Sequence, residues 1–225
     1  KMFSLGNLNN REGYFALRTG INLDTNKDSR LGYSCPNIQS NTPIVWMNAA
    51  EVAFLKAEGA LRGWNMGVDA EEAYKQGILS FAEWGAGGAD AYMKDSKKTA
   101  ANYVDPLTSS NNINAVSHIT IAWDESDSKD KNLERIITQK WIAMFPNGHE
   151  AWTEYRRTGY PQLFPVKVNN SAGTIDTDIQ IRRMPFAKSE YTLNPEGIRK
   201  AVELLGGPDN GGTRLWWDVE NKSVN

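Results

Sequence analysis

Paired carboxylates are the groups in this sequence best suited to catalysis, because a glycoside hydrolase needs only two of them. Glu150 and Glu154 are one helical turn apart and would share a helix face. Arg156 and Arg157 follow within reach of them. Because cations so close favour charged carboxylates, we predict a structural ion-pair network here, not a catalytic pair.

The other titratable groups are too scattered for a catalytic or metal site. Glu51 and Glu58 lie two turns apart on another predicted helix, where a solvated or ion-paired role is favoured. His118 and His149 are far apart, and nothing nominates the further ligands that a zinc site requires. Neither histidine has a nucleophile elbow nearby. We therefore predict no histidine-based metal site, no cofactor and no enzymatic activity.

One segment has part of the pattern of a calcium loop. Asp24, Asn26 and Asp28 show the alternate-residue spacing that opens such a loop. However, Ser29 stands where the turn glycine belongs, and Cys35 stands where the bidentate glutamate belongs. A surface turn is favoured over a calcium site, which stays open as the alternative.

Aromatic side chains within polar loops are the candidates for ligand contact. The chain has 8 Trp, 8 Tyr and 7 Phe, and packing in the core is the favoured role for any single one. Stacking on a sugar ring instead needs an exposed aromatic face with amide or carboxylate groups beside it. The candidate ligand contacts are Tyr92, Tyr103, Trp123 and Tyr33. Asn102, Asp105 and Asp124 are the neighbouring groups that could bind hydroxyls.

The composition is that of an ordinary globular protein. The net charge of −2 and the absence of a basic cluster argue against a nucleic-acid partner. No stretch approaches the roughly 18 apolar residues of a membrane helix. The chain starts at Lys1, so the lack of a targeting segment does not indicate the cytoplasm.

Apolar residues spaced three and four positions apart predict a helical hairpin in the first part of the chain. Residues 1–43 lack periodicity and are expected to form a lead-in with at most short strands. The helical stripe of residues 44–64 comprises Met47, Ala50, Phe54, Ala57, Leu61 and Trp64. A second helix should run from Asp69, its N-cap, to Gly85. Two helices joined so closely pack antiparallel, which predicts a tetratricopeptide-type hairpin over residues 44–85.

A long insertion and further helices follow. Residues 86–128 are polar and aperiodic, and a binding loop or an inert surface insertion fits them equally well. A helix is predicted from Asp130 to Phe145, and a shorter one carries Ala151, Trp152 and Tyr155 before Gly159.

The last part of the chain predicts a β-hairpin and one more helix. Residues 162–187 alternate in polarity on two arms around a polar turn. Asn194 caps the helix, with Pro195 at its first position and Gly206 closing it. The tail residues Trp216, Trp217 and Asp218 are expected to form a plug over the core.

Several motifs in order resemble the SusD/RagB family. They occupy residues 47–52, 57–58, 63–64, 139–148, 150–152, 156–161, 182–186, 189–191 and 194–196. The match runs from about residue 43 to 205 and places the family signature within residues 129–225. It implies a mainly α, SusD-like scaffold of tetratricopeptide-type hairpins, with a small β-hairpin and long loops. It also identifies this chain as the carboxy-terminal portion of such a protein.

The resemblance implies a non-catalytic glycan-binding lipoprotein of the outer membrane. Such a protein would be anchored by a lipid outside this chain and would deliver oligosaccharide to a SusC-like TonB-dependent transporter. Alternatives on the same scaffold are binding of peptides or another nutrient. A glycosidase and a purely protein-binding scaffold are the rivals from other classes.

The motif residues are expected to have architectural roles. Trp141 and Trp152 should meet in the core. The arginines of the motifs should hold a helix end to a strand through forked hydrogen bonds to glutamate or carbonyl groups. These arginines are Arg156, Arg157, Arg182 and Arg183. The family's ligand residues do not carry over by motif, because they lie in variable loops.

Overall fold

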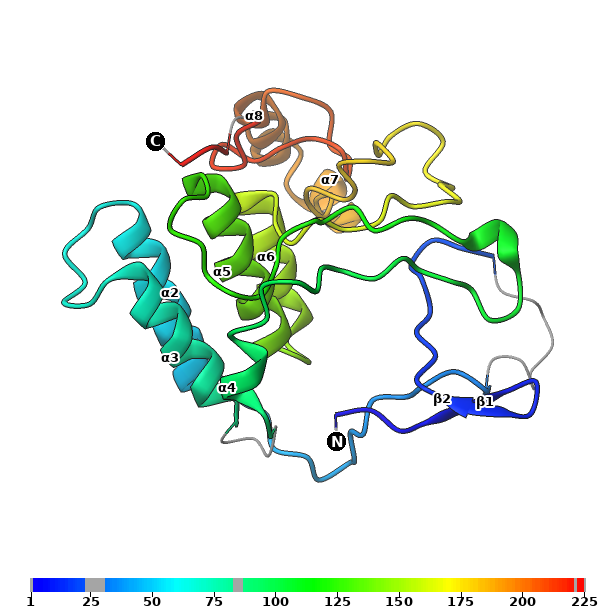
Figure 1. Ribbon diagram of the computed structural model, residues 1–225. Helices are drawn as coiled ribbons and strands as arrows, with labels where there is room; N and C mark the ends of the chain where they lie inside the picture. The colour runs from blue at the N-terminus through cyan, green and yellow to red at the C-terminus, as the bar shows by residue number, and fades with distance from the viewer. Residues whose placement is uncertain (1, 23–30, 83–86, 221, 225) are drawn as a thin grey trace. The chain divides into compact units, whose positions relative to one another are not determined.

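The computed structural model of the chain describes residues 2–22, 31–82, 87–220 and 222–224 (Figure 1). Its residues divide into two compact units. Unit 1 comprises residues 1–18, 23–163 and 223–225, and unit 2 comprises residues 19–22 and 164–222. The predicted calcium-loop residues Asp24, Asn26 and Asp28 lie outside the described residues.

Unit 1 begins with a two-stranded antiparallel hairpin. Strand β1 (Gly6–Leu8) pairs with β2 (Arg11–Gly13). The turn residues Asn9 and Asn10 have φ angles of 52° and 58°, the left-handed conformation that two-residue hairpin turns require. The prediction of short strands in the lead-in is confirmed.

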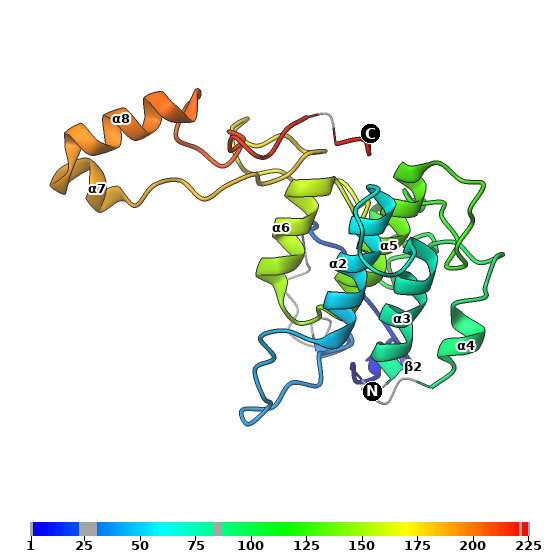
Figure 2. The same ribbon diagram turned by 90° about the vertical axis from the view of Figure 1, so that its left-hand side faces the viewer.

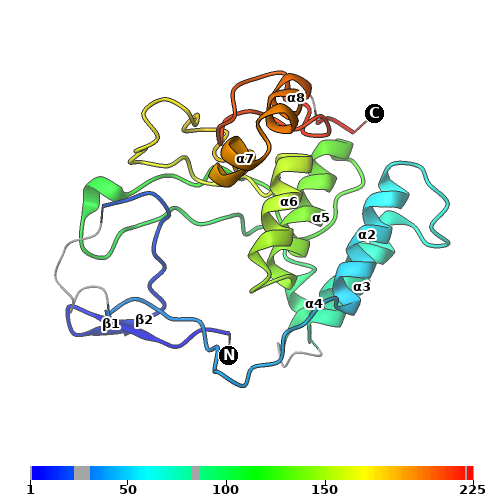
Figure 3. The same ribbon diagram turned by 180° about the vertical axis from the view of Figure 1, so that it is seen from behind.

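Helices α2 (Ala49–Leu61) and α3 (Ala70–Ala82) form the predicted helical hairpin and lie side by side in Figures 1 and 3. The side chains of Asn48 and Asp69 cap them, each with an oxygen 2.7 Å from the amide nitrogen three residues on. Such a cap satisfies an amide that otherwise has no partner in the first turn, and contributes roughly 1 kcal/mol.

The first helix is shorter than its apolar stripe suggested. Met47 precedes the Asn48 cap and is 61% exposed. Trp64 follows Gly63, whose φ of 84° ends the helical path, and is 65% exposed. Both were predicted to face the core and do not, because the caps exclude them from the helix.

Helices α5 (Lys129–Ala143) and α6 (Gly148–Thr158) complete the helical part of unit 1. Helix α5 packs against α2, α3 and α6. The long insertion between α3 and α5 contains the short helix α4 (Ala89–Tyr92) and the 3-10 turn η1 (Ser109–Asn111). Its remaining described residues are mostly turns and loops, as their lack of periodicity predicted.

The core of unit 1 lies between α2, α3 and α5. Its buried members are Ala50, Phe54, Ala57, Ala73, Tyr74, Ile78, Met93, Leu133, Ile136, Ile137, Ala143 and Val224. The rings of Phe54 and Tyr74 meet edge to face, with centroids 6.2 Å apart. Burial of each large side chain contributes about 1.5–3 kcal/mol.

The predicted meeting of Trp141 and Trp152 in the core is wrong. Helix α5 turns Ile136, Ile137 and Lys140 inward, which leaves Trp141 at the next position 41% exposed. Trp152 is partly buried, and the Arg156 guanidinium lies 3.6 Å from its ring centroid.

Unit 2 contains the helices α7 (Lys188–Leu193) and α8 (Pro195–Leu205), which Figure 2 shows in succession. Helix α8 begins and ends as predicted. The Asn194 side chain accepts a hydrogen bond from the Gly197 amide, and Gly206 ends the helix with a φ of 71°. Helix α7 was not predicted.

The β-hairpin predicted for residues 162–187 is absent, since the described structure has no strand in this range. Its backbone amides bond elsewhere. The amide of Val168 donates to the carbonyl of Gly20 at 2.8 Å, and the amide of Arg182 donates to the carbonyl of Gly211 at 2.7 Å. Long-range partners have therefore replaced the local strand pairing that the alternation indicated.

The tail residues that were expected to form a plug differ in exposure within unit 2. Trp216 is 90% exposed, whereas Asp218 is 1% exposed and binds Arg182. Among the described residues, no helix has both the length and the apolar character needed to cross a bilayer.

Candidate functional site

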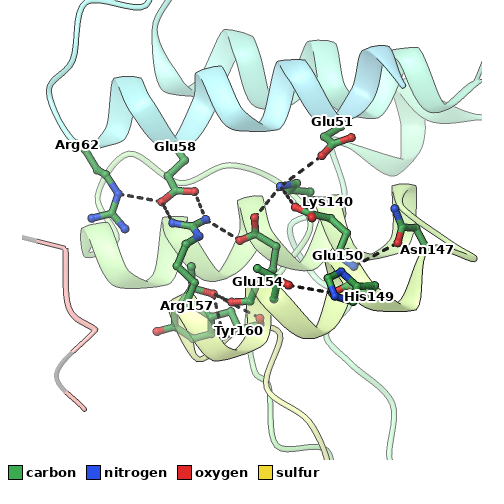
Figure 4. A network of polar contacts seen from close by, with 12 residues as sticks. Glu51, Glu58, Arg62, Lys140, Asn147, His149, Glu150, Glu154, Arg157 and Tyr160 are labelled. Atoms are coloured by element: carbon green, nitrogen blue, oxygen red, sulfur yellow. Dashed lines mark hydrogen bonds and ion pairs between the residues drawn. The ribbon is translucent and has the colours of Figure 1, made fainter. Parts of the chain in front are cut away.

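A buried lysine is the centre of a polar network between α2, α5 and α6 (Figure 4). Lys140 is 1% exposed, and its Nζ atom lies 2.6 Å from Glu154 and 3.3 Å from Glu150. Glu51 of α2 faces it at 3.9 Å. A buried ammonium group requires such partners, because leaving water without them is costly.

Arg157 extends the network to the opposite end of α2. Its two terminal nitrogens each lie 2.6 Å from a carboxylate oxygen of Glu58, and one also lies 2.6 Å from Glu154. Arg62 donates from Nε to Glu58 at 2.9 Å. The network therefore connects three helices through charge-assisted hydrogen bonds.

Ion pairing and burial shift the pKa values of the charged groups in the network. Although burial opposes it, hydrogen bonds from Arg157 and Arg62 hold the pKa of Glu58 below its usual value. The pKa of Arg157 is raised despite burial, because Glu58 and Glu154 bind it. Burial raises the pKa of Glu51, and the charge of Lys140 partly offsets this rise.

The predicted structural ion pairs are thereby confirmed. Glu150 and Glu154 share the Lys140 ammonium, and Glu58 takes Arg157 and Arg62. The guanidinium of Arg156 lies over the Trp152 ring, and it also donates from Nε to the Trp152 carbonyl and from Nη2 to the Thr153 hydroxyl, each at 3.4 Å.

Two of the four candidate ligand residues lie around Asp105. This carboxylate is 7% exposed and accepts hydrogen bonds from the amides of Leu107 and Thr108 at 2.9 and 2.8 Å. The Tyr103 hydroxyl donates to it at 3.2 Å, and the Asn111 amide donates at 3.0 Å. Asp105 therefore orders the loop that carries Tyr103.

Burial and this carboxylate raise the pKa values of both neighbouring tyrosines. The pKa of Tyr103 rises to about 12, chiefly through burial and partly through Asp105. The pKa of Tyr33 is raised by the same two causes. Tyr33 is only 7% exposed, so its ring lacks the open face that stacking on a sugar requires.

The other two candidates lie around Tyr74 of the core. The rings of Trp123 and Tyr74 have centroids 5.5 Å apart, and the Trp123 Nε1 atom donates to Glu125 at 2.7 Å. Tyr92 is 40% exposed, and the Gln139 amide nitrogen donates to its hydroxyl at 2.9 Å. The four candidates thus form two pairs: Tyr103 and Tyr33 lie near Asp105, and Trp123 and Tyr92 lie near Tyr74.

The polar neighbours that we expected to bind hydroxyls have internal partners. The Asn102 side chain accepts from the Ala115 amide at 2.9 Å, and the Asp124 side chain accepts from the Ser126 amide and hydroxyl. Asp105 is occupied as described above. These side chains therefore stabilise the conformation of their own loops.

The structure exposes other aromatic faces that sequence reasoning did not select as ligand contacts. Trp46 and Trp216 are each 90% exposed, and Trp64 is 65% exposed. Periodicity had placed Trp64 in a helix stripe, while Trp216 had been expected to pack. The sequence did contain a signal that these tryptophans lie in loops: Gly63 directly precedes Trp64, and Gly211 and Gly212 precede Trp216 by a few residues.

No metal site emerges from the described part of the chain, where no three histidine, cysteine or acidic side chains are grouped to hold an ion. His149 packs against Trp152 edge to face, with ring centroids 6.3 Å apart.

The family to which this fold belongs is shown by the match of the chain to a known family model. Residues 1–218 match the family model of SusD-like proteins, described as "Susd and RagB outer membrane lipoprotein". The chain belongs to the SusD-like family. The described residues form a mainly helical structure with one small antiparallel sheet, which agrees with the folds of SusD homologues.

Solved SusD homologues resemble the chain over nearly its whole length. A chitin-binding SusD homologue from Flavobacterium johnsoniae is 48% identical, with a TM-score of 0.89 over 98% of this chain and 46% of its own. A SusD homologue from Bacteroides thetaiotaomicron is 42% identical, with a TM-score of 0.91 over 96% of this chain and 47% of its own. A third, from Bacteroides uniformis, is 45% identical, with a TM-score of 0.91 over 97% and 46%. The chain therefore spans just under half the length of these relatives. No curated protein matches it.

The SusD-like motif residues have mostly scaffold roles in this structure. In unit 2, Arg182 forms a fork to Asp218, with distances of 2.7 and 2.6 Å from Nε and Nη2 to the two oxygens. Arg183 binds Asp209, which also accepts from the Tyr191 hydroxyl at 2.7 Å. Two of the predicted forked bonds are present: Arg157 makes one to the glutamate Glu58, and Arg182 makes one to the loop aspartate Asp218. Neither joins a helix end to a strand, because residues 182–186 are not in a strand.

Proposed function

We propose that this chain is part of a non-catalytic, cell-surface glycan-binding protein that delivers oligosaccharides to a SusC-like TonB-dependent transporter. The observation that carries this proposal is the 48% identity with a chitin-binding SusD homologue across 98% of the chain. The family description supports a position at the outer membrane.

Chitin-type oligosaccharides are the first ligand class to test. Their N-acetylated rings present flat apolar faces, hydroxyls and amides, which aromatic rings and polar loop groups recognise. Tyr92 is the most exposed of the four predicted contacts, and Tyr103 and Trp123 are partly accessible. Trp64 and Trp216 offer further open faces. Tyr33 remains a predicted contact with the least accessible ring.

The ion pairing of the acidic residues Glu150 and Glu154 supports a binding role and not a catalytic one. A retaining or inverting glycosidase needs one carboxyl group that holds a proton beside a second that is free to act. The Glu150 and Glu154 carboxylates instead bind the same ammonium group, and Arg157 also binds Glu154.

The decisive experiment uses the complete reading frame that contains this chain. Affinity electrophoresis and calorimetry against chitin oligosaccharides, starch, xylan and mannan would be run while released reducing sugar is assayed. Retention by one glycan without hydrolysis is the expected result. Hydrolysis would refute the non-catalytic role. Failure to bind any glycan would refute glycan binding and favour a peptide or a protein partner.

The delivery role has its own test. A tagged form of the complete protein, isolated from native outer membranes in mild detergent, should carry a TonB-dependent barrel in stoichiometric amount. Isolation without any barrel would contradict the proposed partner while leaving glycan binding intact.

A further inference from the structure

The polar network between α2, α5 and α6 contains more carboxylates than cations (Figure 4). Within the described part of the chain, its ion pairs join four carboxylates to three cations. The carboxylates are Glu51, Glu58, Glu150 and Glu154, and the cations are Arg62, Lys140 and Arg157. Because an uncompensated charge is costly to bury, the excess negative charge requires neutralisation.

The contact distances single out Glu51 as the carboxylate with the weakest pairing. The Nζ atom of Lys140 lies 2.6 Å from Glu154 and 3.3 Å from Glu150, and it donates a hydrogen bond to each. It lies 3.9 Å from Glu51, which is beyond hydrogen-bond distance. Among the described residues, no side chain donates a hydrogen bond to the Glu51 carboxylate, although the residue is only 7% exposed.

The elements packed around Glu51 supply no second cation for an ion pair within the described residues. The start of α2 lies beside the end of α5, where the Asn48 side chain donates to the Ala143 carbonyl at 3.2 Å. Lys140 is the basic residue of that last turn of α5. Lys56 of α2 and His149 of α6 are exposed. The charged residues of α3 all lie in its first half, whereas the hairpin brings the end of α3 towards Glu51: Glu71, Glu72 and Lys75.

We infer that the folded network is a proton-binding site and that the proton resides on Glu51. A protonated carboxyl group carries no charge and can donate a hydrogen bond, so it removes the excess negative charge of the network. Burial raises the pKa of Glu51. The charge of Lys140 partly offsets this rise, and the nearby Glu150 and Glu154 carboxylates add to it.

This proton does not make the network catalytic. A general acid must reach its substrate, whereas Glu51 is 7% exposed. The two neighbouring carboxylates, Glu150 and Glu154, are both bound to Lys140 and are not available as a base or a nucleophile. The proton therefore acts on the packing of the helices, and the inference is independent of the ligand.

Protonation should strengthen the contact between α2 and the pair of helices α5 and α6. Ionised Glu51 would bring an unneutralised charge into this contact. A carboxyl group with a raised folded-state pKa stabilises the fold below its ordinary value of 4.5, and this contribution is lost as the pH rises through the folded-state pKa. The contact is thus a pH-sensitive element that loosens as Glu51 ionises.

Two matched substitutions on α2 test this inference in the protein from the complete reading frame. Glu51→Gln provides a neutral side chain of the same size. Glu58→Gln is the control, because hydrogen bonds from Arg157 and Arg62 lower the pKa of Glu58 although burial opposes this. The unfolding equilibrium constant of each variant is measured by urea denaturation, from below the ordinary glutamate pKa of 4.5 up to neutral pH.

We expect Glu51→Gln to match the parent protein in acid and to lower the unfolding equilibrium constant about three- to tenfold near neutral pH, since one pKa unit corresponds to a factor of ten. Glu58→Gln should instead raise this constant near neutral pH, by an amount that narrows in acid. A Glu51→Gln effect without pH dependence, or one with the sign of Glu58→Gln, would overturn the inference, because Glu51 would then be ionised and paired with Lys140.

Glu150→Gln gives a second, independent test. This substitution removes one neighbouring carboxylate, which leaves the network with as many cations as carboxylates. Glu51 should then hold its proton less tightly, so adding Glu51→Gln to Glu150→Gln should stabilise the protein less than Glu51→Gln does alone near neutral pH. Strictly additive effects of the two substitutions would also contradict the proton-binding site.

Discussion

Arg157 of α6 binds Glu58 of α2 with both terminal nitrogens, each 2.6 Å from a carboxylate oxygen, although 99 positions separate the two residues. The same guanidinium reaches Glu154 one turn before it. This fork connects the helical hairpin to the motif region that distinguishes the SusD-like family. Its planar geometry explains why arginine suits the position better than lysine.

Removal of the fork should destabilise unit 1. Arg157→Ala leaves the buried Glu58 and Glu154 each with one cation fewer. We expect a loss of roughly 2 kcal/mol in the free energy of unfolding, less than for a fully buried pair because the arginine is partly exposed. Urea denaturation measures it. The control is Lys75→Ala, which breaks an exposed pair with Glu71 and should cost less than about 0.5 kcal/mol. Equal losses would contradict the assigned role.

Gly77 should not tolerate a methyl group, despite its position in the middle of α3. An added Cβ would lie 2.5 Å from Phe54 Cε1. Alanine is the better helix former by about 1 kcal/mol, yet the overlap should make Gly77→Ala destabilising by about 1–3 kcal/mol. Gly148→Ala, where a Cβ meets nothing within 4 Å, is the control. The double variant with Phe54→Leu should recover part of the loss in thermal denaturation, and additive losses would disprove the overlap.

Asp218 should make the stability of unit 2 depend on acid pH. Although burial opposes it, hydrogen bonds from Arg182 and Lys222 hold the pKa of Asp218 below the ordinary value of 3.8. A carboxyl group with a depressed folded-state pKa stabilises the fold above its unfolded pKa, and this contribution is lost as the pH falls through the folded pKa.

Asp218→Asn should therefore lose roughly 3 kcal/mol near neutral pH, because it leaves the buried Arg182 without its carboxylate. The difference from the parent protein should narrow as the pH falls below 3.8. Denaturant titrations at a series of pH values measure both the loss of unfolding free energy near neutral pH and its change with pH. Glu220→Gln, which replaces an exposed carboxylate two positions away, is the matched control variant. A pH-independent difference for Asp218→Asn would contradict the assigned ionisation.

Tyr92 offers the sharpest test of the predicted glycan contacts. Its ring is 40% exposed, and its hydroxyl is bonded to Gln139. Loss of a stacking ring should cost about 1 kcal/mol, so Tyr92→Ala should weaken glycan affinity roughly fivefold in calorimetry. Tyr92→Phe keeps the ring and should retain affinity. Tyr14→Ala, at another exposed tyrosine, is the control. Unchanged affinity for Tyr92→Ala would remove Tyr92 from the site.

Local signals in the sequence were sufficient for much of the helical architecture. Asp69 and Asn194 mark helix starts because a cap side chain bonds an amide three residues away, an interaction that needs no distant partner. The pairing of Glu154 with Arg157 was also predictable, because one helical turn brings the two side chains together. Glu150 pairs instead with Lys140 of another helix.

The tertiary structure alone decided which distant groups meet. Residues 162–187 alternate like strands, yet Val168 bonds to Gly20 and Arg182 bonds to Gly211. Only packing brings Lys140 to Glu51 and Arg157 to Glu58. The aromatic candidates separated into two pairs for the same reason. Local propensity is set within a few residues, whereas burial and long-range pairing depend on how whole elements pack, which periodicity does not encode.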